Sequence, residues 1–405
     1  MLTRRQLLAL LPAAALPLDA QVRLFRRKPK PKPAPMPFVY IGTDTSRASA
    51  KGIYVSRFDV ATGHFTDPVL AAACVRPSYF AVDRKRAGAQ SRMFLYSVNA
   101  GTGADAGVTS YQMNPATGAL SQIGQVSSGG DGPCYIGLDA EGHSAYVADY
   151  NGGSIATYLI QADGSLSEAV DRVDFRVPRF GHHGPVAGRQ DGSHPHTTML
   201  SPDNRFLIVN DLGNDDIVTF PVNTETAKLG APRVIASRIA GTGPRHIAFH
   251  PNGRWVYGID ELANRIDEYL WNSTRGSSVA EPEAILTETG RSVSTLDPGF
   301  HGTSTAAEIV VAPSGGFVYG SNRGENSLVV FSIDALNGNL TFVQRISCGG
   351  KTPRHFTLDA SGKWLVCGNQ DSASVTVFKV DTGSGKLSGP TQTLPIDSPM
   401  FTLFA

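Results

Sequence analysis

Short apolar runs alternate with turn residues along almost the whole chain after Phe38. In "IAFHPNGRWVYGI", for example, a Pro-Asn-Gly turn separates two such runs. Runs of this length, bounded by Gly, Asn, Asp and Pro and without a helical period, indicate β-strands joined by tight turns. The pattern therefore predicts an all-β domain.

The runs also recur as a larger unit. Each copy has a first strand, a turn such as Pro-Asn-Gly or Pro-Ser-Gly, a second strand that ends in Asp or Asn, and a third strand, and most copies add a fourth. The residue that opens the first strand is a proline in nearly every copy. The opening positions are Pro77, Pro133, Pro195, Pro244, Ala306, Pro353 and Pro399.

The two ends of the chain supply complementary parts of one unit. The last copy, "SPMFTLFA", ends after a single strand, whereas "FVYIGTDTSRASAKGIYVSRFDVATGHF" near the N-terminus supplies three strands without a first one. We expect seven four-stranded antiparallel blades in a β-propeller, its ring closed by the C-terminal strand joining the N-terminal blade. A flat β-sandwich would explain neither the repeat nor the divided unit.

The first 37 residues differ in character from the rest. Residues 1–20 contain the pair Arg4-Arg5 and an apolar run from Leu7 to Leu16, too short to span a bilayer, and predict a cleaved export signal of the twin-arginine type. Residues 21–37 are basic and proline-rich, as in an extended linker. We expect the propeller to occupy residues 38–405 and the protein to be exported to the periplasm or beyond, without stable membrane association after cleavage.

Overall composition excludes several other classes of protein. The 36 basic and 35 acidic residues leave a net charge of +1, and no nucleic-acid-binding motif is present, so we expect no nucleic-acid partner. The four cysteines lack the C-x-x-C spacing of a zinc site, and we expect them to be free and buried. Nothing in the sequence requires a cofactor, and we expect a monomer.

Two columns of the repeat place varied residues at one mouth of the channel. The first strands of a propeller line its channel, and the first and second strands are antiparallel, so the start of one and the end of the other lie together. A column here is the set of equivalent positions in successive copies. A position that the fold itself requires would hold one residue type in every copy, as the Asp or Asn at the end of each second strand does. The varied residues of these two columns suggest instead either a composite site or a mouth that merely tolerates charge. The first column is the residue after each opening residue and comprises Ser78, Cys134, His196, Arg245, Ala307, Arg354 and Met400. The second column is the residue after the Asp or Asn that ends each second strand and comprises Tyr150, Leu212, Glu261, Arg323 and Gln370.

Several of these residue types carry chemistry. Arg245 and Arg323 present planar forks for a carboxylate, a phosphate or a polarised carbonyl oxygen. His196 is a candidate acid/base; His194 alternates to the opposite strand face, so we expect no shared metal site. Glu261 is either a base or the salt-bridge partner of the arginines, and the sequence leaves both roles open.

Neighbouring segments add further candidates. His246 and His355 each follow a Pro-Arg pair and alternate away from the first column, so we expect both to pack within their blades. The insertion "RFGHHGPVAGRQDGSHP", with Arg189 and Gln190, precedes the strand of His196 and is either a lid over the mouth or an ordinary surface loop. A second insertion carries His301.

The sequence resembles the seven-bladed propeller lactonase family, which includes a bacterial 6-phosphogluconolactonase and a fungal carboxymuconate lactonizing enzyme. The likeness rests on "RQDGSHPHTTMLSPDNRFLIVNDLGNDDI", "GTGPRHIAFHPNGRWVYGIDEL", "AAEIVVAPSGGFVYGSNRGENSL" and "TPRHFTLDASGKWLVCGNQDS". By resemblance to the lactonizing branch, the catalytic set is His196, Arg245, Glu261 and Arg323. The lactonase branch implies His194, Arg189 and Gln190 as substrate contacts, to which the columns and the second insertion add Arg354, Gln370 and His301.

The resemblance implies hydrolysis of a sugar-type or carboxylated lactone, in which water attacks a carbonyl polarised by arginines. No G-x-S-x-G motif is present, so a covalent acyl-enzyme is not expected. A muconate-lactonizing type of cyclase or isomerase is one alternative. A non-catalytic exported propeller that binds a carbohydrate or a protein is another. The expected export also argues against phosphogluconolactone, an intracellular metabolite, as the physiological substrate.

Overall fold

The computed structural model describes residues 36–405 except 48, 84–92, 181, 238 and 274–283. The predicted export signal (1–20) and the predicted linker as far as residue 35 lie outside the described residues. Met36–Ala405 forms one compact unit. Among the described residues, no helix combines the length and the apolarity that a membrane crossing requires.

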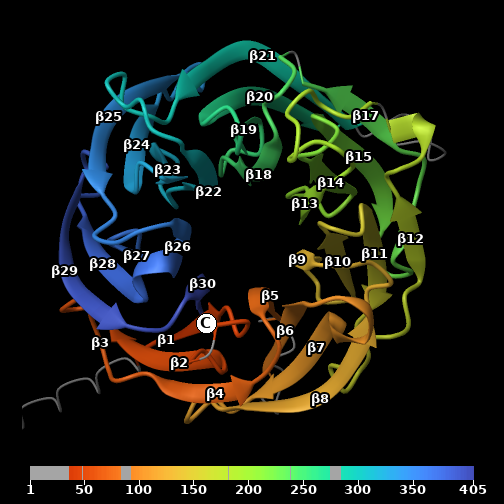
Figure 1. The fold of residues 1–405 in the computed structure, drawn as a ribbon, viewed down its shortest axis with the longest axis horizontal. Coiled ribbons are helices and arrows are strands. Elements are labelled where there is room, and N and C mark those ends of the chain that lie inside the picture. Colours follow the sequence, from red (N-terminus) through yellow and green to blue (C-terminus); the bar gives the residue numbers. More distant parts are fainter. Residues whose placement is uncertain (1–35, 48, 84–92, 181, 238, 274–283) are drawn as a thin grey trace, which may run out of the picture. The chain divides into compact units, whose positions relative to one another are not determined.

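The described chain forms seven antiparallel sheets arranged as blades around a central channel (Figure 1). Each blade places its first strand innermost. The first two complete blades are β5 (Pro77–Asp83), β6 (Met93–Ala100), β7 (Ala106–Met113) and β8 (Leu120–Ser127), then β9 (Pro133–Leu138), β10 (Ser144–Asp149), β11 (Ser154–Leu159) and β12 (Asp171–Asp174). The third is β13 (Pro195–Leu200), β14 (Phe206–Asp211), β15 (Asp216–Asn223) and β17 (Arg233–Ala236), with the short β16 (Lys228–Leu229) beside β15.

The remaining blades follow the same order. The fourth and fifth are β18 (Pro244–Phe249), β19 (Trp255–Asp260), β20 (Arg265–Ser273) and β21 (Ala284–Ser294), then β22 (Thr305–Val311), β23 (Phe317–Arg323), β24 (Ser327–Ile333) and β25 (Leu340–Ser347). The sixth is β26 (Pro353–Leu358), β27 (Trp364–Asn369), β28 (Ser374–Val380) and β29 (Leu387–Pro395). Short 3-10 helices are η2 (Gly103–Asp105), η3 (Pro178–Phe180) and η4 (Gln370–Ser372).

The ring closes as the repeat predicts. β30 (Pro399–Phe404) is innermost in the seventh blade and pairs antiparallel with β1 (Phe38–Thr43), with Tyr40 opposite Leu403. β2 (Gly52–Asp59), the short β3 (His64–Phe65) and β4 (Val69–Ala73) complete this blade. Six of the seven predicted opening residues are the first residues of their strands, and β22 begins one residue earlier, at Thr305. The predicted seven-bladed fold is confirmed.

The hydrophobic core lies between the faces of neighbouring blades. One cluster, for example, joins Tyr146 of β10 to Leu207 and Val209 of β14, and all three side chains are fully buried. Because every blade packs against two others around the ring, apolar burial fixes the radial positions of the innermost strands. The four cysteines are free; Cys74 is only half-buried, and the other three are buried as expected.

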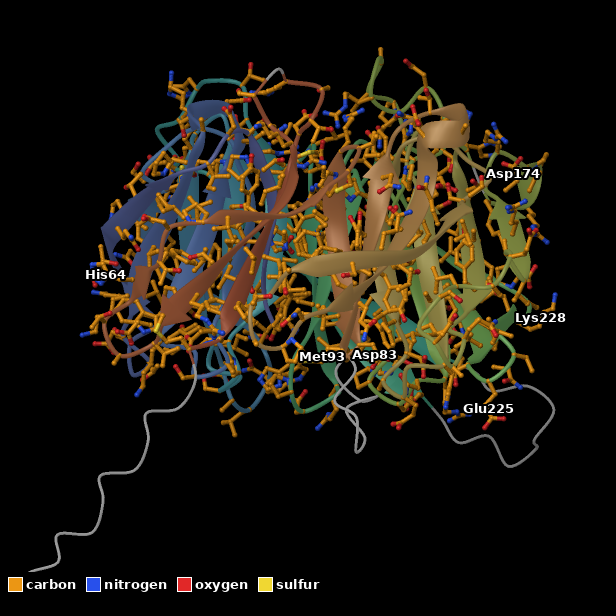
Figure 2. The ribbon with its side chains drawn as sticks, turned by 90° about the horizontal axis from the view of Figure 1, so that it is seen from below. His64, Asp83, Met93, Asp174, Glu225 and Lys228 are labelled. Atoms are coloured by element: carbon orange, nitrogen blue, oxygen red, sulfur yellow. The ribbon has the colours of Figure 1, made fainter. Side chains whose placement is uncertain are left out.

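The two faces of the ring are distinct. Asp83 at the end of β5 pairs with Phe94 near the start of β6, and Figure 2 places Asp83 and Met93 at one face. The starts of the innermost strands, and the ends of the second strands, therefore lie at the opposite face. This is the mouth at which the two sequence columns meet.

A β-bulge occurs near the start of every innermost strand. In β18, Pro244 pairs with Asp260 and His246 pairs with Ile259, so Arg245 is the extra residue. A bulge re-aims the side chains beside it and breaks the regular alternation of a strand. The extra residues are Ser78, Cys134, His196, Arg245, Arg354 and Met400, and in β22 Ala307 and Glu308 lie opposite Ser321. The first sequence column is thus the bulge column of the fold.

Candidate functional site

A pocket of about 260 Å³ opens at the channel mouth where the two columns meet. Five bulge residues and three residues of the second column line it, so the repeat geometry predicted their proximity correctly. Its lining comprises Arg76, Ser78, Ala100, Gly132, Cys134, Tyr150, Asn151, Arg189, His196, Glu261, Arg323, Arg354 and Met400.

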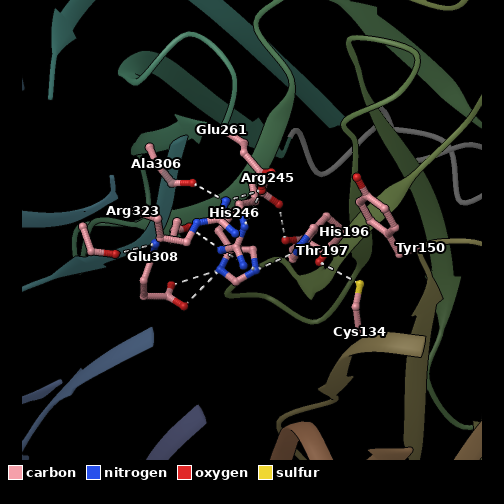
Figure 3. A network of polar contacts seen from close by, with 12 residues as sticks. Cys134, Tyr150, His196, Thr197, Arg245, His246, Glu261, Ala306, Glu308 and Arg323 are labelled. Atoms are coloured by element: carbon pink, nitrogen blue, oxygen red, sulfur yellow. Dashed lines mark hydrogen bonds and ion pairs between the residues drawn. The ribbon is translucent and has the colours of Figure 1, made fainter. Parts of the chain in front are cut away.

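Glu261 lines this pocket and is the anionic centre of an arginine cluster, of which Arg245 and Arg323 are labelled in Figure 3. Its carboxylate is buried, with Oε2 lying 2.9 Å from Arg245 Nε and 2.8 Å from Arg323 Nη2. Arg189, from the insertion before β13, pairs with Oε1 through Nη2. Three elements distant in sequence therefore converge on one carboxylate.

The arginines determine the ionisation of Glu261. Burial alone would raise the pKa of its carboxyl, but the guanidinium groups of Arg323, Arg245 and Arg189 outweigh burial and hold that pKa at about 2. Glu261 is consequently charged at neutral pH, and a carboxylate of such low basicity accepts a proton poorly. Of the two roles that the sequence left open, the geometry favours the salt-bridge partner.

Main-chain oxygens hold two of the guanidinium groups in place. Arg245 Nη1 donates to the carbonyl oxygen of Ala307, and Arg323 Nη2 donates to that of Ala306 at 2.9 Å. Both carbonyls belong to the start of β22. Because each arginine contacts both a main-chain oxygen and Glu261, Arg245 through two different nitrogens and Arg323 through Nη2 alone, the cluster is pre-organised before any ligand binds.

Arg354 differs from the other arginines of the pocket. Among the described residues, no acidic side chain forms an ion pair with it, although it is only partly exposed. Burial, followed by repulsion from Arg245 and Arg323, lowers the pKa of its guanidinium to about 10, so it remains a cation at neutral pH. The pocket thus has an excess of positive charge, which suits an anionic ligand.

His196 is a buried neutral imidazole at the edge of the same pocket. Burial, then the charges of Arg245 and the proximity of His246, lower the pKa of His196 well below its usual value of 6.5. Its Nδ1 lies 3.1 Å from His246 Nε2. A neutral imidazole can accept a proton at pH 7, which is the property required of a general base.

Cys134 also lines the pocket beside His196, with its Sγ 3.8 Å from the carbonyl oxygen of His196. Burial raises the pKa of this thiol to about 12 in spite of Arg245 and Arg354. The thiol is therefore protonated at neutral pH, and the thiolate that a cysteine nucleophile requires is not formed.

The expectation that His246 and His355 pack within their blades is wrong. Both line the channel one layer below the pocket, where His246 Nδ1 and His355 Nε2 each lie 3.1 Å from the carboxylate of Glu308. The physical reason is the bulge, because it cancels the alternation that would have turned these side chains away. The residues two positions after each opening residue form this layer: Tyr79, Tyr135, Thr197, His246, Glu308, His355 and Phe401.

Gln190 lies away from the pocket and anchors the insertion that carries Arg189. Its buried Nε2 donates to the carbonyl oxygen of Leu212 at 2.8 Å and to Asp215 Oδ1 at 2.7 Å. Asp215 also accepts from the backbone nitrogen of Gly243, 2.7 Å away, just before Arg245. The insertion is thereby tied to the start of β18, and the amide of Gln190 is already occupied by these hydrogen bonds.

The other three predicted substrate contacts do not line the pocket either. His194 stacks on Tyr150 with ring centroids 4.4 Å apart, and its Nδ1 lies 2.8 Å from the carbonyl oxygen of Tyr150. Gln370 Nε2 donates to Asp44 Oδ2 at 3.4 Å, across the seam of the closing blade. His301 is exposed between β21 and β22. Of the six predicted contacts, only Arg189 and Arg354 line it.

Glu308 is the functional candidate that sequence reasoning missed. Its column, two positions after the opening residues, mixes histidine, glutamate and tyrosine as freely as the bulge column does, and this variety was the available signal. In the described part of the chain, no group of three or more His, Cys, Asp or Glu side chains is arranged to hold a metal ion.

Comparison with known proteins agrees with this architecture. Residues 38–404 match the profile of the family described as "Lactonase, 7-bladed beta-propeller". The chain belongs to this lactonase family. It is 29% identical to a 6-phosphogluconolactonase of Bacillus subtilis over 90% of this chain and 97% of that protein. It is 28% identical to a 6-phosphogluconolactonase of Formosa agariphila over 88% of this chain and 96% of the relative.

A solved structure of a family relative is similar throughout. The periplasmic gluconolactonase of Pseudomonas aeruginosa superposes with a TM-score of 0.80 at 30% identity, covering 91% of this chain and 99% of that one. The expected resemblance to the propeller lactonases is therefore confirmed.

Proposed function

We propose that this protein hydrolyses a sugar-type lactone that carries an anionic group, a carboxylate or a phosphate. The observation that carries the proposal is that a neutral imidazole, His196, lines one pocket together with arginines that exceed the charge of Glu261. These arginines include Arg189, Arg323 and Arg354, and the buried Arg245 pairs with the same glutamate. Relatives that match most of the chain are named 6-phosphogluconolactonase and gluconolactonase, which supports a lactone as the substrate class.

In the proposed step, His196 Nε2 takes a proton from water while the water oxygen bonds to the lactone carbonyl carbon. The π-electron pair of the carbonyl moves onto its oxygen, which gains negative charge near the guanidinium groups. The carbonyl then re-forms, the bond to the ring oxygen breaks, and that oxygen receives the proton from His196. A positioned general base contributes about 10²–10⁴-fold to such a step.

The arginines divide the remaining work. Arg245 and Arg323, held by Glu261 and by main-chain oxygens, stabilise the developing oxyanion, and losing one such donor costs on the order of 10²–10³-fold in rate. Arg354, which lacks an acidic partner among the described residues, binds the anionic substituent of the substrate. Glu261 keeps the cluster in register and is not the base.

Titration of released acid tests this function. Purified protein is assayed in a pH-stat with glucono-1,5-lactone, its 6-phosphate and a carboxylated muconolactone, alongside His196→Gln and Arg323→Gln. We expect turnover that both substitutions reduce by 10²-fold or more. If the wild-type rate equals that of buffer for every lactone, the hydrolase proposal fails and a binding protein is favoured. Formation of muconolactone from cis,cis-muconate, followed by its ultraviolet absorbance, would instead indicate a cyclase.

We also propose that the protein acts outside the cytoplasm. Support comes from the arginine pair Arg4-Arg5 before an apolar run, and one relative is itself described as periplasmic. Fractionation of cells producing the full chain, compared with the variant Arg4→Lys/Arg5→Lys, tests this. We expect the wild type in the periplasmic fraction and the variant in the cytoplasm; wild-type protein in the cytoplasm would contradict the proposal.

A further inference from the structure

We propose that Glu308 and His246 are positioning residues that hold His196 in one tautomer, with Nδ1 protonated and Nε2 free to accept a proton from the pocket. Three innermost strands, β22, β18 and β13, supply the three side chains, which follow one another in a line of hydrogen bonds (Figure 3). The kinetic part of this proposal rests on the proposed function, whereas the tautomer itself does not.

The direction of the hydrogen bonds follows from Arg245. Its Nη1 lies 3.4 Å from His246 Nε2, and a guanidinium has only donors, so His246 Nε2 must be the unprotonated nitrogen. His196 Nδ1, 3.1 Å from the same atom, is then the donor of the shorter bond to the single lone pair of His246 Nε2, which the longer Arg245 contact shares. A neutral imidazole carries one proton, and with that proton on Nδ1 the other nitrogen of His196 has a free electron pair.

Glu308 fixes the other end of the line. With Nε2 unprotonated, His246 carries its proton on Nδ1, which lies 3.1 Å from both carboxylate oxygens of Glu308. The backbone nitrogen of Ile309 donates to Oε1 at 3.0 Å. Glu308 thus receives donors, as a carboxylate does.

His355 supplies a further donor to the same carboxylate. Its Nδ1 accepts from the backbone nitrogen of Thr402 at 3.3 Å, so its proton lies on Nε2, 3.1 Å from Glu308 Oε2. The imidazole rings of His246 and His355, which belong to different blades, therefore each donate a hydrogen bond to Glu308, so both contacts make it an acceptor. All four side chains of the network, His196, His246, Glu308 and His355, are no more than 7% exposed.

Aromatic side chains surround the hydrogen-bonded imidazoles and limit the access of water to them. Tyr135 and Tyr79 close the layer beside His246 with ring centroids 5.5 Å and 6.1 Å away, and Phe401 covers His355 at 3.9 Å. The charged groups that face the line are Arg245, Arg323 and Arg354 above and Glu261 beyond them. Burial raises the pKa of Glu308, whereas His355 and Arg245 favour its charged form, and Glu308 is the acidic group in contact with His246.

The consequence for chemistry is twofold. In this tautomer Nε2 of His196, whose side chain lines the pocket, is the nitrogen left to accept a proton, so no change of tautomer precedes proton transfer. When His196 accepts a proton it becomes a cation close to Arg245, and the carboxylate of Glu308, relayed by His246, stabilises that cation in a water-poor site. A line of hydrogen bonds that ends in a buried carboxylate is the arrangement expected of a base-orienting device.

Nitrogen NMR of the intact protein tests the tautomer without any assay of activity. The full chain is labelled with ¹⁵N-histidine, and long-range ¹H–¹⁵N correlations of His196, assigned by comparison with His196→Gln, are recorded at pH 7. We expect Nδ1 to show the shift of a protonated nitrogen and Nε2 that of an unprotonated one. The opposite pattern would overturn the proposal, whether or not any lactone is turned over.

Two substitutions test the positioning role. Glu308→Gln removes the charge and presents a donor as well as an acceptor, and His246→Gln breaks the line; Glu268→Gln, at a buried carboxylate of β20 that is paired with Arg291, is the matched control. We expect kcat to fall on the order of 10²-fold for the first two, with KM nearly unchanged, and the protonated Nδ1 signal of His196 to weaken in Glu308→Gln.

The outcomes separate the two proposals. If the wild type turns over lactones and Glu308→Gln and His246→Gln match the Glu268→Gln control in kcat, the positioning role is wrong while the proposed function stands. If the wild type hydrolyses no lactone yet shows the expected tautomer, the proposed function fails and the tautomer assignment survives.

Discussion

Arg245 Nε lies 2.9 Å from Glu261 Oε2, and the two residues come from opposite ends of a single β-hairpin in sequence. Antiparallel pairing of β18 and β19 brings the start of one strand to the end of the other, with Pro244 opposite Asp260. The bulge at Arg245 then turns its side chain toward the channel mouth. This ion pair is the centre to which Arg323 and Arg189 are added by two other parts of the fold.

Replacing Glu261 with glutamine should destabilise the protein at neutral pH. The pKa of this carboxyl falls from 4.5 to about 2 on folding, so its stabilisation is complete above pH 4.5 and is lost as pH falls toward 2. The shift corresponds to about 3 kcal/mol of unfolding free energy. Urea unfolding at pH 7 and pH 3 measures it; the deficit should shrink at pH 3, and exposed Glu225→Gln should show none at either pH. An equal deficit at both pH values would contradict the pKa assignment.

Replacing Arg354 with glutamine should raise KM selectively for anionic lactones. A charge-assisted hydrogen bond contributes roughly 1.5–3 kcal/mol, which corresponds to about a tenfold to hundredfold rise in KM. Neutral glucono-1,5-lactone should be little affected, because it has no anion to lose. Steady-state kinetics with both substrates decide the matter, with exposed Arg233→Gln as the control. Equal losses for the neutral and the anionic lactone would place Arg354 elsewhere in the mechanism.

The acid limb of the pH–rate profile should lie below pH 6.5. Burial, Arg245, His246 and Arg354 lower the pKa of His196, and only the neutral imidazole is a base, so kcat/KM should fall only once the pH drops below that lowered pKa. Removing one positive charge should raise the same pKa, so Arg354→Gln should move the limb to higher pH. A profile whose acid limb is centred above 6.5, or does not move in the variant, would rule out His196 as the titrating base.

Substituting Gly213 with alanine should loosen the insertion that carries Arg189. A Cβ at Gly213 would overlap the carbonyl oxygen of Gly192 and lie 2.9 Å from the backbone nitrogen of His194. Overpacking of this kind costs roughly 1–3 kcal/mol, and the displaced backbone would carry Arg189 away from Glu261. We expect faster amide hydrogen exchange in residues 182–194 and a higher KM.

Gly192→Ala is the matched control for this substitution, because nothing lies within 4 Å of a Cβ at that position. It should leave both exchange and KM unchanged. If Gly213→Ala behaved like Gly192→Ala, the insertion would not be held by this close approach.

The fold and part of the site follow from sequence alone for a definite physical reason. Strand period and turn residues are local properties, and seven repetitions of them leave radial closure as the arrangement that pairs the single strand at Pro399–Phe404 with the three near Phe38. Antiparallel pairing then places Arg245 beside Glu261 in one blade. The same pairing places Arg323 at the same mouth of the channel in the neighbouring blade. Strand pairing thus predicted the proximity of Arg245, Glu261 and Arg323, although Gln370, from the same column as Glu261, does not line the pocket.

The roles of individual side chains depended instead on distant contacts. Strand alternation turned His246 and His355 away from the channel, but the bulges, which arise where the blades converge, turned them into it and onto Glu308. Whether Glu261 is a base or an ion-pair partner is decided by Arg245 of its own blade and Arg323 of the next, both within 3 Å. Whether Gln190 contacts a ligand or anchors a loop is decided by the acceptors Leu212 and Asp215 that lie within 3 Å of its amide nitrogen. Sequence repetition therefore predicted where the candidate site lies, whereas tertiary packing determined the pKa and the hydrogen bonds of each residue there, because both depend on neighbours that the local sequence does not specify.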